Sequence, residues 1–154
     1  MKLAKTLYTA SAEETERIGE SLAKEILEDR TLPHFVALFG DLGVGKTAFV
    51  RGFTSPIAPQ STVRSPTFAI VNEYKGNPLS VFHFDMYRID SEDDLLSIGY
   101  DDYLIRRGIC ITEWSERIPE AIPEEHIAVL IEKNDPQKPD SRKITVKLMR
   151  EEHA

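Results

Sequence analysis

Cysteine is nearly absent from this sequence, since Cys110 is the only one. One thiol cannot form an intrachain disulfide or supply the thiolate cluster of a structural metal site, which fits a reducing compartment. Long apolar runs are absent too, because nothing approaches the roughly 18 consecutive apolar residues of a membrane-spanning helix. Residues 1–5 also lack the apolar core of a signal peptide. We therefore expect a soluble cytoplasmic protein without a membrane partner.

Basic residues are fewer than acidic residues. The chain has 19 Lys and Arg residues against 26 Asp and Glu residues, which gives a formal net charge of −7. No segment gathers the basic residues into a stripe that would neutralise the phosphates of a nucleic acid. Non-specific nucleic-acid binding is therefore not expected to be the task of this chain.

Internal repeats and low-complexity segments are also missing. The length of 154 residues suits a single core. A composition of 41% hydrophobic and 29% charged residues is typical of a globular protein. We expect one domain over residues 1–154, with one functional site.

Apolar spacing in the first part of the chain predicts both helices and strands. A capping box at Ser11 to Glu14, followed by apolar residues at spacings of four, predicts a helix over residues 12–29. A nearly unbroken apolar run at residues 34–39 predicts a strand covered on both faces. A short strand is expected near residues 5–8, and a second helix over residues 46–54, ended by prolines.

Strands dominate the rest of the chain. Apolar segments at residues 67–74 and 80–85 flank a turn-forming stretch, so a β-hairpin is expected after the second helix. Residues 133–143 are polar and contain two prolines, which predicts an exposed loop. The other expected elements are a short helix at 91–98 and strands at 109–112, 127–131 and 144–149.

Residues 40–47 carry the clearest motif. They read Gly-Asp-Leu-Gly-Val-Gly-Lys-Thr and match the phosphate-binding pattern Gly-x4-Gly-Lys-[Ser/Thr] in full, between an expected strand and an expected helix. Glycines let the backbone turn so that its N–H groups meet phosphate oxygens at the positive end of the helix. Lys46 would reach the β- and γ-phosphates, and Thr47 would place its hydroxyl on Mg²⁺. The nucleotide contacts expected here are those of Asp41, Leu42, Gly43, Val44, Gly45, Lys46, Thr47 and Ala48.

This motif, together with the order of elements, predicts the fold class. We expect an α/β fold, a single P-loop NTPase-like domain with a mixed, mostly parallel sheet flanked by helices. The alternative interpretation of the motif is a glycine-rich turn followed by a chance Lys-Thr pair.

Two acids follow apolar strands and could complete a magnesium site. Asp85 follows residues 81–84, and Glu113 follows residues 109–112. Ends of parallel strands line the ligand crevice, so either acid could hold the metal while the other orients water. The alternative is that one of them caps a turn or pairs with Arg88.

Further residues bear on the choice of nucleotide and on the surroundings of the site. The guanine-reading tetrapeptide Asn-Lys-x-Asp is missing, so ATP is preferred over GTP. Trp114 and His83 each have two open interpretations, a place in the site or a place in the core. Cys110, inside an apolar run, is expected to be a buried small hydrophobe.

Several motifs in this order resemble the TsaE family, the small bacterial ATPases of tRNA threonylcarbamoyladenosine synthesis. The resemblance covers the chain from Thr9 to about Ile131. The phosphate loop alone is generic, whereas the later motifs are specific to the family. They are Ser65-Pro66-Thr67-Phe68, Asn72-Glu73-Tyr74, His83-Phe84-Asp85-Met86-Tyr87-Arg88 and Glu113-Trp114.

The resemblance implies a role for each motif. Thr47 and Glu113 would ligate Mg²⁺, and Asp85 would be needed for hydrolysis alongside Lys46. The region from Thr9 to Ser11 would border the adenine, with Ser11 as a nucleotide contact. The residues assigned to the two switch segments and their surroundings are Ser65, Pro66, Thr67 and Phe68 for the first, and His83, Tyr87, Arg88 and Trp114 for the second.

The resemblance also implies partners. Family members act beside TsaD and TsaB, which move a threonylcarbamoyl group from its adenylate to adenosine 37 of tRNA. This chain would support or regulate that transfer through an ATP cycle, and it would meet tRNA only through its partners. Two regions depart from the family pattern, since residues 54–63 carry two prolines and no glycine, and the tail from Asn134 matches nothing specific.

Two other functions stay open. The first is a small-molecule P-loop kinase, although such enzymes close an Arg-bearing lid over the phosphate. Here Arg106-Arg107 is the only adjacent Arg pair, and no acceptor-binding motif is evident. The second is a nucleotide-gated binding module without meaningful turnover.

Overall fold

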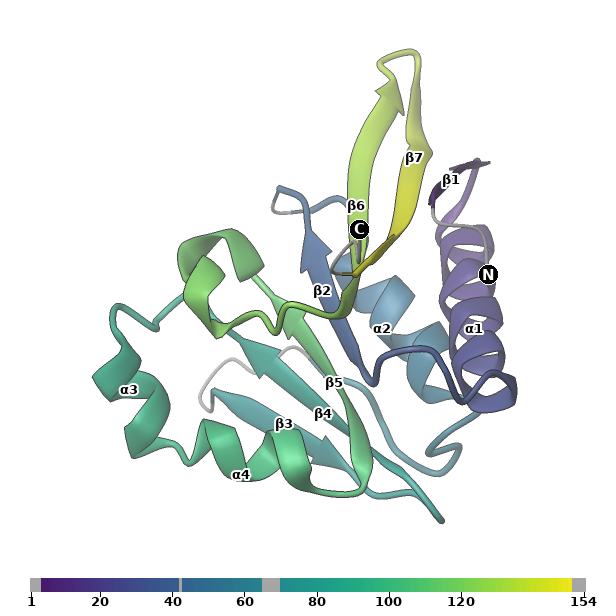
Figure 1. Cartoon of the computed structure of the whole chain (residues 1–154). Helices are drawn as coiled ribbons and strands as arrows, with labels where there is room; N and C mark the ends of the chain where they lie inside the picture. Colours follow the sequence, from purple (N-terminus) through teal and green to yellow (C-terminus); the bar gives the residue numbers. More distant parts are fainter. Residues whose placement is uncertain (1–3, 42, 65–69, 151–154) are drawn as a thin grey trace.

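A computed structural model describes residues 4–41, 43–64 and 70–150 of the chain. The described strands form one seven-stranded sheet in the order β1-β7-β6-β2-β5-β4-β3 (Figure 1). The strands are β1 (Ala4–Thr9), β2 (Phe35–Phe39), β3 (Val71–Tyr74), β4 (Ser80–Asp85), β5 (Gly108–Glu113), β6 (His126–Asp135) and β7 (Lys138–Met149). The helices are α1 (Ala12–Glu28), α2 (Lys46–Thr54), α3 (Glu92–Ser97) and α4 (Tyr100–Ile105), with 3-10 turns η1 (Ser115–Arg117) and η2 (Pro119–Ala121).

The expected mixed sheet between helices is confirmed. The central strands β6, β2, β5 and β4 pair in parallel, and the pairings at both edges of the sheet are antiparallel. The antiparallel pair of β3 and β4 is the predicted hairpin after the second helix. Because β2, β4 and β5 run in the same direction, their carboxyl ends meet at one edge of the sheet.

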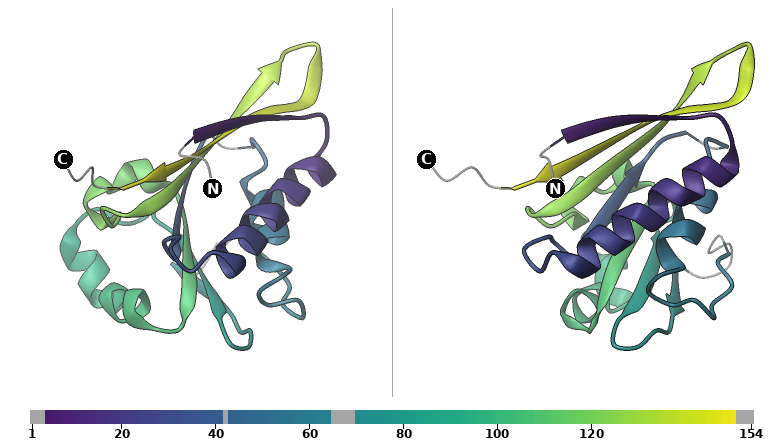
Figure 2. Two further views of the ribbon diagram at one scale, coloured as in Figure 1. Left: turned by 45° about the vertical axis from the view of Figure 1, so that its right-hand side comes forward. Right: turned by 90° about the vertical axis from the view of Figure 1, so that its right-hand side faces the viewer.

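Helices cover both faces of the sheet (Figure 2). Apolar residues of α1 and α2 form one core cluster with one face, and residues of α3 and α4 form a second cluster with the other face. The alternation along β4 shows this division, because Val81 belongs to the first cluster while Phe82 and Phe84 belong to the second. In the part of the chain that the structure describes, no helix has the length and apolar character needed to cross a bilayer.

The start of α1 follows from its sequence. The side chain of Ser11 accepts a hydrogen bond from the backbone N–H of Glu14 at 3.2 Å, and the carboxylate of Glu14 accepts one from the N–H of Ala10. Ser11 caps the helix as predicted and satisfies one N–H group of the first turn, while Glu14 reaches back to the residue before the cap, one position earlier than in a standard capping box. The predicted helix is confirmed with its end at Glu28.

The expected loop at residues 133–143 is wrong. Strand β6 continues to Asp135 and β7 begins at Lys138, so a two-residue turn joins them and the hairpin extends past the rest of the sheet (Figure 1). Most of these side chains are exposed. A strand with water on both faces has no apolar alternation to reveal it, and the ladder of backbone hydrogen bonds sets its conformation.

Helix α4 is a second element that the sequence did not predict. It begins after Gly99, which has a φ of +72°, and it contains only six residues. A segment this short cannot display two turns of apolar periodicity.

Cys110 is buried in β5, with 2% of its surface exposed. Burial raises the pKa of its thiol to about 12, so the thiolate is not populated near neutral pH. The expectation of a buried small hydrophobe is confirmed.

Glycines allow α1 and α2 to pack in backbone contact. A Cβ atom added at Gly52 would lie 1.8 Å from the carbonyl oxygen of Glu16. We predict that Gly52→Ala lowers the free energy of unfolding by about 3 kcal/mol, since the helices would have to separate. Urea unfolding measures this change. The neighbouring variant Arg51→Ala, on the exposed face, should stay within about 0.5 kcal/mol of the wild type, and equal values for both would contradict the close contact.

Candidate functional site

The phosphate loop joins β2 to α2 and depends on glycine backbone conformations. Gly40 and Gly45 have φ values of +144° and +103°, which side chains with a Cβ rarely adopt. A Cβ at Gly40 would also lie 2.5 Å from the carbonyl oxygen of Ile131. Gly45 is the N-cap of α2 and offers no side-chain hydrogen bond to its first turn. The loop therefore leaves backbone N–H groups at a helix N-terminus available to an anion.

Lys46 lies across this loop. Its ammonium group donates a hydrogen bond to the carbonyl oxygen of Gly40 at 2.9 Å and sits 4.1 Å from the centre of the Trp114 ring. The residue is only 6% exposed. A buried cation held by a carbonyl and an aromatic face is positioned beside the loop where an anion would bind. The structure thus brings Trp114, whose place the sequence left open, into contact with the predicted phosphate-binding residue.

The two predicted acids end neighbouring strands. Asp85 of β4 and Glu113 of β5 are register partners, so their side chains leave the same face of the sheet. Glu113 is buried, and its carboxylate contacts Nε2 of His83. Asp85 is half-buried and accepts a hydrogen bond from the N–H of Tyr87 at 2.9 Å. Asp85 therefore does cap a turn, while its second carboxylate oxygen has no hydrogen bond or ion pair with any described residue.

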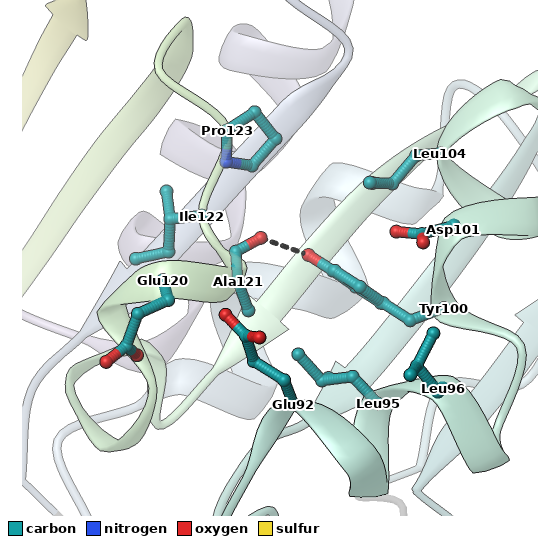
Figure 3. A pocket seen from close by; sticks show the side chains of 10 residues that line it. All are labelled: Glu92, Leu95, Leu96, Tyr100, Asp101, Leu104, Glu120, Ala121, Ile122 and Pro123. Atoms are coloured by element: carbon teal, nitrogen blue, oxygen red, sulfur yellow. Dashed lines mark hydrogen bonds between the residues drawn. The ribbon is translucent and has the colours of Figure 1, made fainter.

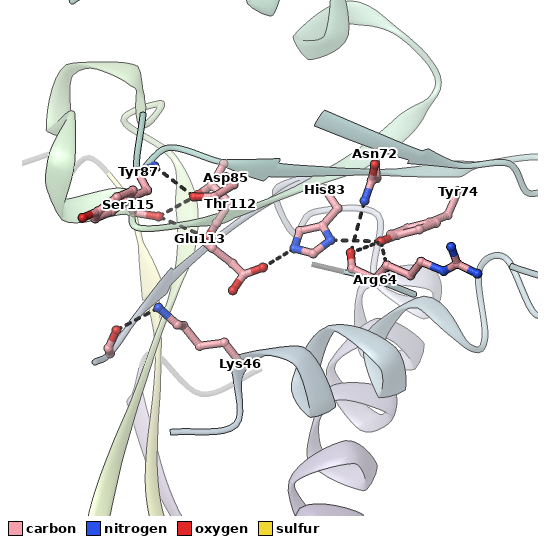
Figure 4. A network of polar contacts seen from close by, with 11 residues as sticks. Lys46, Arg64, Asn72, Tyr74, His83, Asp85, Tyr87, Thr112, Glu113 and Ser115 are labelled. Carbon is pink, nitrogen blue, oxygen red and sulfur yellow. Dashed lines mark hydrogen bonds and ion pairs between the residues drawn. The ribbon is translucent and has the colours of Figure 1, made fainter. Parts of the chain in front are cut away.

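His83 connects Glu113 to a second strand (Figure 4). Its side chain is completely buried, and its Nδ1 atom lies 3.1 Å from the hydroxyl of Tyr74 in β3. The hydroxyl of Tyr74 donates to the carbonyl of Arg64 at 2.9 Å and accepts from the N–H of Arg64 at 3.2 Å. His83 is thus both a satisfied core histidine and a neighbour of the predicted metal ligand. Tyr74 belongs to the Asn72-Glu73-Tyr74 motif, to which the sequence assigned no role.

Trp114 sits at a strained turn after β5. Its φ of +57° makes it the only non-glycine residue with positive φ in the described part of the chain. Such a conformation is rare for a bulky side chain and concentrates at functional sites. The ring of Tyr87 lies 5.1 Å from the Trp114 ring, and the guanidinium of Arg117 lies over Tyr87. Arg88, predicted in the same switch, is exposed.

The N-terminal region and the β6–β7 hairpin reach the other side of the loop. A small hollow of about 60 Å³ is lined by Ala12 and Thr15 of α1, by the loop, and by Arg142 of β7. The guanidinium of Arg142 donates to the carbonyl oxygens of Val44 at 2.7 Å and Gly43 at 3.4 Å. No local pattern indicated Arg142, because it is 98 positions away from Val44 in a segment that was expected to be an exposed loop.

The remaining predicted contacts lie around the loop. Asp41 is exposed and, with Gly40, borders a polar hollow of about 470 Å³ beside β6. Thr47 is half-buried in the first turn of α2, and Ala48, the next residue, is buried. Ser11 is engaged as the cap of α1. The predicted contact Leu42 and the first-switch residues Ser65, Pro66, Thr67 and Phe68 lie outside the described residues.

A separate apolar hollow of about 380 Å³ lies between α3, α4 and η2 (Figure 3). Tyr100 lines it and donates its hydroxyl to the carbonyl oxygen of Ala121 at 2.7 Å. Burial raises the pKa of Tyr100, so this hydroxyl stays protonated and remains a donor. None of the predicted site residues lines this hollow.

Comparisons with known proteins find relatives that match most of the chain. The family model described as "Threonylcarbamoyl adenosine biosynthesis protein TsaE" matches residues 9–144. The TsaE protein of Bacillus subtilis is 35% identical over 137 residues, 89% of this chain and 81% of that protein. The TsaE protein of Haemophilus influenzae is 38% identical over 120 residues, 77% of this chain and 76% of that protein.

A solved structure extends the likeness to the fold. The crystal structure of YdiB from Bacillus subtilis superposes with a TM-score of 0.73 at 29% identity, covering 97% of this chain and 88% of that one. The family match and the relatives each span most of the chain, and the structural match includes the arrangement of sheet and helices. The chain therefore belongs to the TsaE family of threonylcarbamoyl adenosine biosynthesis proteins.

Proposed function

We propose that this protein is a Mg²⁺-dependent ATPase that acts in the biosynthesis of threonylcarbamoyladenosine in tRNA. Membership of the TsaE family and the phosphate-loop fold indicate a nucleotide-binding protein. The proposed hydrolysis and its dependence on Mg²⁺ rest on one arrangement at the carboxyl ends of β2, β4 and β5. Lys46 lies across the loop that follows β2, and Asp85 and Glu113 end the neighbouring strands β4 and β5. The printed names of the relatives supply the biosynthetic context.

The residues present fit a nucleotide with a magnesium ion. The loop offers N–H groups and the Lys46 ammonium to the phosphates. Mg²⁺ would be held by the hydroxyl of Thr47 and the carboxylate of Glu113, and would neutralise charge on the phosphates. Within residues 4–41, 43–64 and 70–150, no three His, Cys, Asp or Glu side chains gather as a metal cage. Magnesium in phosphate-transfer sites needs only one or two carboxylates, because phosphates and water supply its other ligands.

Asp85 is the group proposed to act on the attacking water. In hydrolysis the water oxygen forms a bond to the γ-phosphorus and the bond from that phosphorus to the β-phosphate oxygen breaks. The water gives up a proton to the products or the solvent, and ADP and phosphate leave. A carboxylate at the end of β4 can accept a hydrogen bond from that water and orient it. Asp85 has a carboxylate oxygen with no hydrogen bond to any described residue, and its backbone is fixed by a hydrogen bond from its N–H to the carbonyl of Ile70 at 2.8 Å.

The position of Arg106, in the Arg106-Arg107 pair, does not support the lid of a small-molecule kinase. The guanidinium of Arg106 contacts the carboxylate of Glu73 and lies 4.8 Å from the centre of the Phe82 ring. Arg106 lies two residues before the start of β5, so it lies near the amino ends of the strands. The phosphate loop lies at their carboxyl ends, and Arg106 is held away from it.

The proposed partners are TsaD and TsaB, in the cytoplasm, with tRNA held by the partners. The net charge of −7 suits a chain that leaves tRNA phosphates to other proteins. Nucleotide hydrolysis would change the surface around His83 to Arg88, because segments next to a γ-phosphate are commonly ordered by it. The ATP and ADP states would then differ in their affinity for the partners.

We predict that the protein binds a TsaD–TsaB complex about tenfold more tightly with a non-hydrolysable ATP analogue than with ADP. Such a difference needs only about 1.4 kcal/mol, within reach of one or two hydrogen bonds. Calorimetric titration in each nucleotide measures it, and ATP turnover is followed with and without the partners. Thr67→Ala is expected to reduce the difference while leaving nucleotide affinity nearly intact.

Equal affinity in both nucleotide states would rule out the switch. Tight tRNA binding by the isolated chain at physiological salt would contradict the proposal that the partners hold the tRNA. Absence of ATP turnover, alone and with partners, would leave a nucleotide-gated binding module as the better description.

A further inference from the structure

The buried contacts around Glu113 continue beyond the expected metal site. Glu113 and His83 lie on the adjacent parallel strands β5 and β4, and Tyr74 lies on the edge strand β3. Each nitrogen of the His83 ring has one polar partner, Glu113 at Nε2 and Tyr74 at Nδ1. The ring cannot turn without breaking one of these contacts, and a broken contact would leave a polar atom without a partner in a site closed to water.

The far end of this chain of contacts is a backbone group. The Tyr74 hydroxyl bonds both the N–H and the carbonyl of Arg64, and the amide of Asn72 donates to the same carbonyl at 3.1 Å. Arg64 directly precedes residues 65–68, which the family resemblance assigns to a first switch segment. A single hydroxyl thus joins the interior of the sheet to the backbone at this position (Figure 4).

We infer that Tyr74 and His83 are positioning residues that couple the carboxylate of Glu113 to the backbone at Arg64. A continuous set of buried hydrogen bonds can carry coupling between two sites when both ends bias the same contacts. Groups that bond a metal-binding carboxylate also fix its orientation, and their loss weakens metal binding. The inference rests on the proposed role of Glu113 toward Mg²⁺ and adds a residue, Tyr74, that lies on the edge strand β3.

The test uses Tyr74→Phe, which removes one hydroxyl and keeps the ring. The matched control is Tyr100→Phe, because Tyr100 is also buried and also donates to a backbone carbonyl, on the opposite face of the sheet. Backbone amide hydrogen exchange is followed by NMR in the nucleotide-free protein. In Tyr74→Phe the Arg64 amide should exchange about tenfold faster, the effect of one lost hydrogen bond. In Tyr100→Phe it should exchange at the wild-type rate.

The effect of Glu113 on the Arg64 backbone is measured with Glu113→Ala, again without nucleotide. Faster exchange at the Arg64 amide is expected, and the effect should be smaller when Tyr74→Phe is already present, because the two changes break one chain of contacts. Additive effects, or an Arg64 amide unaffected by Glu113→Ala, would overturn the inference. This measurement uses no ATP, so it stands even if the proposed hydrolysis fails.

The consequence for metal binding is read from nucleotide affinity. Tyr74→Phe should leave affinity for ATP without Mg²⁺ unchanged and reduce the gain from adding Mg²⁺ by about threefold or more, whereas Tyr100→Phe should change neither. A residue with a merely structural role would lower the melting temperature without this selective loss. A wild-type gain from Mg²⁺ in Tyr74→Phe would contradict the coupling, whereas no gain in the wild-type protein itself would count against the proposed function.

Discussion

Replacement of Lys46 by alanine is expected to reduce ATP hydrolysis by roughly 100- to 1,000-fold, the range for loss of one preorganised group that stabilises transition-state charge. The ammonium is already placed in the loop by the carbonyl of Gly40 and the ring of Trp114, so little reorganisation is needed when phosphate charge develops. Backbone N–H groups carry only partial charges and cannot replace it. Release of phosphate, followed in single and multiple turnover, measures the loss.

The matched control is Lys24→Ala. Lys24 is exposed and pairs with Glu20 one helical turn away at 2.9 Å, a contact worth at most a few tenths of a kcal/mol. This variant should hydrolyse ATP at the wild-type rate. Wild-type turnover by a folded Lys46→Ala protein, judged by circular dichroism and melting, would show that the phosphate loop is not the site of hydrolysis.

Replacement of Glu113 by glutamine is expected to remove most of the dependence of nucleotide binding on magnesium. The substitution keeps the shape of the side chain and removes the negative charge that the cation needs. Affinity for ATP in the absence of Mg²⁺ should be nearly unchanged, whereas the gain on adding Mg²⁺ should fall by about tenfold, equivalent to about 1.4 kcal/mol. Titration calorimetry with and without Mg²⁺ measures both quantities.

Asp85→Asn provides the contrast that makes this assignment specific. It should bind ATP with Mg²⁺ as the wild type does and hydrolyse it roughly 100-fold more slowly, as expected for loss of the group that orients the attacking water. Glu120→Gln, on an exposed carboxylate, should change neither property. Exchanged phenotypes of Glu113→Gln and Asp85→Asn would reverse the roles proposed for the two strand ends.

Local patterns predicted those parts of the fold that local physics determines. The capping box at Ser11 set the start of α1, and the apolar run at residues 34–39 identified the central strand. The end of the β6–β7 hairpin was not predicted, because both of its faces are exposed to water and its conformation is set by pairing between the two strands. Arg142, within that hairpin, bonds Val44 across 98 positions of sequence, a relation that no local spacing can encode.

For the candidate site, the sequence indicated residues but not the contacts between them. The phosphate loop is a continuous segment, so Lys46 and Thr47 could be proposed as site residues from the pattern alone. The contact between His83 and Glu113 depends on the register of β4 against β5, which a single sequence does not reveal. The contact between His83 and Tyr74 depends in addition on the register of β3 against β4. Each further strand increases the number of strand pairings that one sequence allows.

The position of Trp114 makes the protein its own optical reporter. It is the only tryptophan in the chain, and the Lys46 ammonium rests 4.1 Å from its ring centre. The emission of an indole responds to a charge this close, so we expect movement of the ammonium toward a bound phosphate to change the signal of a single, known fluorophore. Binding of a nucleotide to the loop would then be followed in real time in the unlabelled protein, by excitation of one side chain.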